Sequence, residues 1–151
     1  MIHTKFYPRF FCAAAVVLLL AVALGAAPTP ASAQVLGADD RVAFRDAILA
    51  QLGAFRRDDG AAAFALAAPA IRETFGTPDA FMEMVRTGYQ PVYRPQVFEF
   101  GVASIGPYGP EQRVFVVGPD RRYYVAIYPM ERQPDGRWLV NGCLLTRAEG
   151  A

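Results

Sequence analysis

Residues 77–100, TPDAFMEMVRTGYQPVYRPQVFEF, contain the change of hydrophobic period that decides the fold. Up to Gly88 the apolar residues recur at helical spacing, with Phe81, Met82 and Val85 on one face. A threonine-proline pair at the start of the stretch is typical of a helix N-terminus. After Gly88, aromatic and β-branched residues take over and the period becomes that of strands. The stretch therefore predicts helices before it and a sheet after it.

The segment before this stretch predicts two further helices. Residues 39–56 carry apolar side chains at three- and four-residue spacing, with two aspartates available to cap the start and a polar face at Arg41, Arg45 and Gln51. A second, alanine-rich helix follows the turn at residues 58–60, is interrupted at Pro69 and then resumes to Phe75.

Asp58 and Asp59 lie next to each other in this turn and have two interpretations. They form a paired-carboxylate site, or they cap the helix ends. Capping is the simpler explanation, because neighbours in sequence rarely point at one target.

Four strands are predicted near residues 96–105, 112–118, 122–130 and 137–147. Their separators are rich in glycine and proline, and such short connections make the strands antiparallel neighbours. The sequence therefore predicts an α+β fold, with N-terminal helices packed on one face of a four-stranded antiparallel meander.

The first 33 residues have the charged, apolar and small-residue segments of a secretory signal peptide, in the usual order. Lys5 and Arg9 precede an apolar run over residues 10–27, and the segment closes with the small residues Ala31-Ser32-Ala33. Cleavage after Ala33 predicts a single domain of 118 residues, 34–151, in the periplasm or secreted. A membrane anchor is the alternative, because the run approaches the length of about 18 residues that a spanning helix needs.

Cleavage would also remove His3 and Lys5, the only histidine and the only lysine of the chain. Ser-His-Asp and Cys-His catalysis, Schiff-base chemistry and zinc sites that need imidazole are then excluded, and we expect no cofactor or metal. The mature chain would then have 13 arginines and 14 acidic residues. This near-zero net charge lacks the basic excess that is typical of proteins that bind nucleic acid.

Cys143 would be the remaining thiol, so no intrachain disulfide is expected. Its apolar neighbours favour a small buried residue, and an intermolecular or redox-active thiol is the alternative.

The run AFRRDDGAAAFALAAPAIRETFGTPDAFMEMVRTGYQPVYRP (54–95), together with GRWLVNGCLL (136–145), resembles a family of exported bacterial proteins, domain of unknown function 4864. The resemblance covers about residues 42–145. It implies the NTF2-like, cystatin-like superfamily, in which a curved sheet wraps helices into a cone that can hold a small ligand. No activity comes with the resemblance.

Residues 88–95, between helices and sheet, contain Tyr89, Tyr93, Arg94 and two prolines. The prolines favour extended neighbours, so we expect a stiff crossing strap. In one interpretation the strap lines the mouth of a pocket. The tyrosine hydroxyls would then hydrogen-bond a ligand, and Arg94 would bind a carboxylate of that ligand. In the other, the tyrosine rings are buried and Arg94 pairs with an acid of the chain.

The third predicted strand is rich in tyrosine, and alternation divides it into two faces. One face must meet the helices, while the other stays exposed or packs on a partner, which motivates a homodimer through the sheet. Scattered surface aromatics are the alternative. The two faces are Tyr124, Ala126, Tyr128 and Met130 on one side and Tyr123, Val125 and Ile127 on the other.

Two classes of function follow. The first is a non-catalytic module that binds a small apolar or acidic ligand, or a protein partner. The second is a histidine- and metal-independent enzyme, in which a carboxylate base and tyrosine hydroxyls act inside the cone. Glu99 is the candidate base on strand alternation, although Phe98 and Phe100 would then face outward.

Overall fold

The structure is a computed structural model that describes residues 35–148. The predicted signal segment, residues 1–33, lies outside the described residues. None of the described helices is long and apolar enough to cross a membrane. Helices come first along the chain and strands follow: α1 (Ala38–Arg56), α2 (Gly60–Ala65), α3 (Pro69–Phe75), α4 (Pro78–Gly88), α5 (Gln90–Tyr93), β1 (Val97–Gly106), β2 (Gly109–Val117), β3 (Tyr123–Arg132), β4 (Trp138–Val140) and β5 (Leu144–Arg147).

Local capping explains where the helices begin. Thr77 accepts a hydrogen bond from the backbone of Ala80 at 3.2 Å and starts α4, as predicted. Asp59 likewise accepts from the backbone of Ala62 at 3.0 Å and starts α2. The start of α1 differs from the prediction, because Gly37 is its N-cap and Asp40 reaches back to the Gly37 N–H.

The strap between helices and sheet is not extended, so this prediction was wrong. Residues 90–93 form the helical turn α5, and the backbone N–H of Tyr93 donates to the carbonyl of Tyr89 at 2.9 Å. Pro91 is tolerated there because the first turn of a helix leaves its N–H groups without intrahelical partners.

The sheet is open, antiparallel and five-stranded, with β1, β2 and β3 adjacent in chain order. Both β4 and β5 pair with the remaining edge of β3. The single strand predicted over residues 137–147 is thus divided at residues 141–143, where Gly142 has a φ of 129°. The α+β class, with helices packed on one face of a curved meander, is confirmed.

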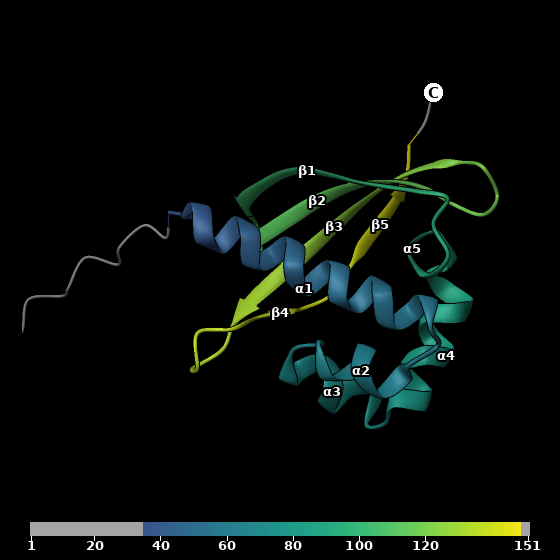
Figure 1. Cartoon of the computed structure of the whole chain (residues 1–151), viewed down its shortest axis with the longest axis horizontal. Helices are drawn as coiled ribbons and strands as arrows, with labels where there is room; N and C mark the ends of the chain where they lie inside the picture. The colour runs from purple at the N-terminus through teal and green to yellow at the C-terminus, as the bar shows by residue number, and fades with distance from the viewer. Residues whose placement is uncertain (1–34, 149–151) are drawn as a thin grey trace, which may run out of the picture. The chain divides into compact units, whose positions relative to one another are not determined.

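Two apolar clusters hold the layers together. Helix α1 lies across the sheet (Figure 1), and its Phe44 packs edge-on against Trp138 of β4 with ring centroids 4.7 Å apart. The second cluster joins the C-terminal end of α1 to the other helices, through Phe55, Phe81 and Tyr93. The predicted inner face of α4 is confirmed, because its buried residues are Phe81, Met82 and Val85.

Candidate functional site

A cavity of about 370 Å³ lies where the two apolar clusters meet. Its walls come from the C-terminal half of α1, from α3, α4 and the short turn α5, and from the divided edge of the sheet. Most of the lining is apolar: Phe55, Ala67, Ile71, Phe75, Phe81, Met84, Val85, Val92, Val140 and Gly142. The polar side chains of the lining are Gln51, Thr74, Tyr89, Tyr128 and Cys143.

The division of the last predicted strand creates one wall of this cavity. Val140 accepts a backbone hydrogen bond from Ala68 at 2.9 Å and donates one to Leu66 at 3.0 Å, which fastens the α2–α3 junction to β4. Directly after Val140 the chain leaves the strand, and both Gly142 and Cys143 line the cavity. The left-handed φ of Gly142 favours glycine at this bend.

The cavity has a buried floor and a partly exposed rim. Tyr128 and Phe55 are each only 4% exposed, and both belong to the floor. Thr74 is exposed, and Phe75 and Met84 are half-buried, so α3 and α4 contribute to the exposed rim.

Tyr128 and Cys143 are neutral polar groups at the sheet side of the cavity. The Cys143 thiol and the Tyr128 hydroxyl are neighbours in the lining, and besides burial Cys143 contributes to the raised pKa of Tyr128. Burial raises the pKa of Tyr128 well above its ordinary value and raises the pKa of Cys143 to about 12. Both groups are therefore protonated at neutral pH, and Cys143 lacks the thiolate form that reacts with oxidants and electrophiles.

Gln51 is a floor residue that the sequence analysis placed on the polar face of α1, and this prediction was wrong. It is 4% exposed, and its side-chain amide donates to the carbonyl of Ala63 at 3.2 Å. The spacing did contain the signal, since Gln51 follows Ile48 by three residues and precedes Phe55 by four.

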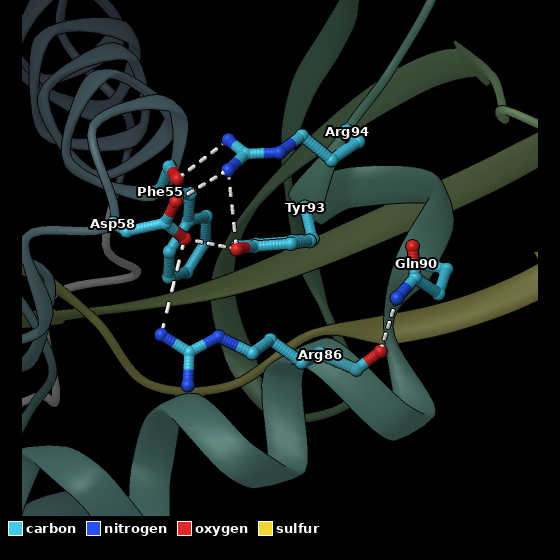
Figure 2. A network of polar contacts seen from close by, with 6 residues as sticks. All are labelled: Phe55, Asp58, Arg86, Gln90, Tyr93 and Arg94. Atoms are coloured by element: carbon cyan, nitrogen blue, oxygen red, sulfur yellow. Dashed lines mark hydrogen bonds and ion pairs between the residues drawn. The ribbon is translucent and has the colours of Figure 1, made fainter.

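The two strap residues Tyr93 and Arg94 lie outside the cavity lining, in a polar network at the end of α1 (Figure 2). Arg94 donates to the carboxylate of Asp58 at 2.8 Å and to the carbonyl of Phe55 at 2.7 Å. Its guanidinium also lies over the Tyr93 ring, 4.3 Å from the centroid. Arg94 is thus paired with an acid of the chain, and Tyr93 buries its ring.

Asp58 is the centre of this network, and its side chain caps neither helix. Its backbone does end α1, because the Asp58 N–H donates to the carbonyl of Phe55 at 3.1 Å and the Asp59 N–H to that of Ala54 at 2.9 Å. The Tyr93 hydroxyl donates to the Asp58 carboxylate, and Arg86 approaches from the other side at 3.9 Å (Figure 2). The hydrogen bond from Tyr93 lowers the pKa of Asp58, and the charges of Arg94 and Arg86 act in the same direction. Its φ of 55° is left-handed, a conformation that aspartate tolerates better than most residues.

The remaining candidates are dispersed. Tyr89 is half-buried and lines the cavity, whereas the Tyr124 hydroxyl donates to Asp120 at 2.7 Å, away from the lining. Glu99 is exposed on the opposite face of the sheet, because Phe98 and Phe100 pack on the core instead. Among residues 35–148, no carboxylate, arginine or lysine lines the cavity.

Alternation along β3 agrees with the predicted faces. Tyr128 and Met130 are buried beneath the helices, while Tyr123 is 53% exposed on the outer face. Cross-strand register places further apolar residues beside Tyr123 on that outer face: Val97, Phe115, Val117, Val125, Ile127 and Leu144.

Comparison with known proteins supplies a family and no activity. Neither the curated proteins nor the solved structures contain a match to this chain. A family model described as a domain of unknown function matches residues 37–151, which include every helix and strand of the structure. The chain therefore belongs to the family called domain of unknown function 4864.

Proposed function

We propose that this protein binds a small, uncharged and largely apolar molecule in the cavity between α3, α4 and the divided edge of the sheet. The cavity itself carries this proposal. Its volume of about 370 Å³ falls within the range of roughly 300–1,000 Å³ that is usual for ligand pockets. An apolar wall with a few polar groups is the usual composition of such pockets.

The lining favours an uncharged ligand over an acidic one. A buried carboxylate needs a cation or several donors to offset its desolvation. Arg94, the cation expected for that purpose, is bound to Asp58 and lies outside the lining.

The lining also disfavours the enzyme alternative. That mechanism needs a carboxylate base beside a tyrosine hydroxyl. Tyr128 and Tyr89 reach the cavity, but no aspartate or glutamate of the described chain lines it, and Glu99 is on the far face of the sheet. A binding role is therefore the better account of the site.

Export through a cleaved leader and membership of the NTF2-like superfamily are parts of the same proposal. The leader is supported by the order of charged, apolar and small residues before residue 34. The superfamily is supported by the resemblance together with helices packed on a curved, open sheet that leave a cavity between them.

Fluorescence of N-phenyl-1-naphthylamine, an uncharged apolar probe, tests the binding proposal. We expect saturable enhancement by the wild-type protein. Thr74→Phe places a ring at the rim and should weaken probe binding at least fivefold. Thr87→Phe is the matched control, because both threonines are exposed and each donates its hydroxyl to the carbonyl four residues earlier at 2.8 Å. No saturable binding, or equal effects of the two variants, would contradict the proposal.

We also propose that the outer face of the sheet pairs two copies of this chain. The apolar side chains that lie next to one another on this outer face favour the pairing. Among them, Phe115 is 48% exposed and Tyr123 is 53% exposed. Light scattering should report a dimer for the wild type and a monomer for Phe115→Glu. A monomeric mass for the wild type at high concentration would end this proposal.

A further inference from the structure

Tyr128 occupies a distinctive position in the cavity. It lies on the inner face of β3, is 4% exposed, and belongs to the cluster between α1 and the sheet while also lining the cavity. Its ring is therefore held by packing, and its hydroxyl has a restricted set of directions. A fixed donor of this kind can discriminate between ligands.

The polar neighbour of this hydroxyl is a weak hydrogen-bond acceptor. Cys143 lines the cavity with Tyr128 and, besides burial, contributes to the raised pKa of Tyr128. A thiol sulfur is a poor acceptor, whereas buried tyrosine hydroxyls usually have a strong partner. An oxygen acceptor within the cavity would therefore form a better hydrogen bond with the Tyr128 hydroxyl than the Cys143 sulfur can.

Two other polar side chains of the lining already donate hydrogen bonds within the chain. The Gln51 amide donates to the carbonyl of Ala63 at 3.2 Å, and the Thr74 hydroxyl donates to the carbonyl of Ala70 at 2.8 Å. Tyr89, the other tyrosine of the lining, is half-buried, so Tyr128 is the more deeply buried hydroxyl donor of the two.

We propose that the ligand carries one uncharged oxygen acceptor, of the ketone, ester or ether type, which receives a hydrogen bond from the Tyr128 hydroxyl. This inference rests on the proposed binding function and specifies its ligand class. The apolar body of the ligand extends from β3 toward the rim at α3 and α4, against Phe55, Phe81 and Val85. A charged acceptor is disfavoured, because the described lining contains no cation to offset its desolvation.

Butyrophenone and butylbenzene, two probes that differ in one carbonyl oxygen, test this inference by displacement of the fluorescent probe. Tyr128→Phe should weaken butyrophenone binding about three- to tenfold, the range expected for loss of one hydrogen bond. Butylbenzene binding should change less than twofold. Tyr124→Phe is the matched control, because Tyr124 lies on the same strand and face but lies outside the lining.

A second variant gives an independent measurement if Tyr128→Phe disturbs folding. Cys143→Ser supplies a stronger acceptor for the Tyr128 hydroxyl, so it should compete with the ketone and weaken butyrophenone relative to butylbenzene. Equal changes for both probes in both variants would overturn the inference and leave the binding proposal standing. If neither probe binds the wild type, the binding proposal itself fails.

Discussion

Arg94 lies 2.8 Å from the Asp58 carboxylate, and this ion pair joins the turn α5 to the end of α1. Both elements contribute to the cavity wall, because Phe55 of α1 and Val92 of α5 belong to its lining. The carbonyl of Phe55 also accepts a hydrogen bond from Arg94. The network around Asp58 therefore positions one side of the candidate site without contacting a ligand.

Asp58→Asn should lower the stability of the protein in a pH-dependent way. Asparagine tolerates the left-handed φ of this position, so the substitution removes mainly the charge. The Tyr93 hydrogen bond, assisted by Arg94 and Arg86, lowers the pKa of Asp58 in the folded state. The ionised group therefore stabilises the fold above its unfolded pKa of roughly 4, and this contribution is lost as pH falls through the folded value.

Melting temperatures between pH 3 and pH 8 measure this effect. The variant should melt below the wild type at pH 7, and the two curves should converge toward pH 3. Asp46→Asn, at an exposed position of α1, is the control. A difference that stays constant with pH would show that Asp58 does not act through its charge.

Gly142→Ala should destabilise the protein by about 1–3 kcal/mol, the usual cost of a non-glycine residue in a strained backbone conformation. Gly142 has a φ of 129°, but an added Cβ would meet no atom within 4 Å. Urea unfolding of the variant therefore isolates backbone strain from steric overlap.

Gly88→Ala is the matched control for this substitution. An added Cβ at Gly88 also meets nothing within 4 Å, and Gly88 is the last residue of α4 without a left-handed φ. This variant should be as stable as the wild type or slightly more stable, because alanine restricts the unfolded chain. Equal losses at both positions would refute the strain argument.

Cys143 should resist alkylation. Burial raises the pKa of Cys143 to about 12, against roughly 8.5 for an unperturbed thiol. At pH 8 its reaction with iodoacetamide should be at least about a hundredfold slower in the folded than in the unfolded chain, because the thiolate is the reactive form. Bound N-phenyl-1-naphthylamine should slow the reaction further.

The experiment uses a chain with the Cys12→Ser substitution, in which Cys143 is the one remaining cysteine. Mass spectrometry can then assign the modification to Cys143. Rapid labelling of the folded chain would indicate an accessible thiolate, and the redox interpretation of Cys143 would then be favoured.

The exported protein should begin at Gln34. Intact-mass measurement of material recovered outside the cytoplasm should show the loss of residues 1–33, which removes the histidine and the lysine of the chain. A mass that retains these residues would contradict cleavage and favour the membrane-anchor alternative. The exclusion of histidine-dependent catalysis would then no longer hold.

Local sequence signals were sufficient to predict most of the secondary structure. The end of a helix at Gly88, the cap at Thr77 and the break at Pro69 each act over a few residues, and the structure contains all three features. Alternation along β3 likewise divided its side chains into two faces, and the structure shows that the face with Tyr128 is the buried one. The family resemblance was also contained in the sequence, because it rests on the same contiguous motifs.

Predictions failed where contacts between segments distant in the sequence decide the conformation of the backbone or the burial of a side chain. Residues 90–93 form a helical turn, and both Tyr93 within the turn and Arg94 directly after it bind Asp58, at the end of a different helix. Gln51 has a polar side chain, but the packing of α1 against its neighbouring elements buries it.

The sequence by itself determined the order of helices and strands, the faces of the amphipathic elements and the family. Only the tertiary structure decided that Tyr128, Cys143 and Gln51 share one cavity, because their elements meet only when the helices pack on the sheet. It also decided that Arg94 is paired with Asp58 and that Glu99 faces outward. The physical reason is that periodicity records which side of an element is buried, while a cavity depends on where the packing of several elements leaves space unfilled.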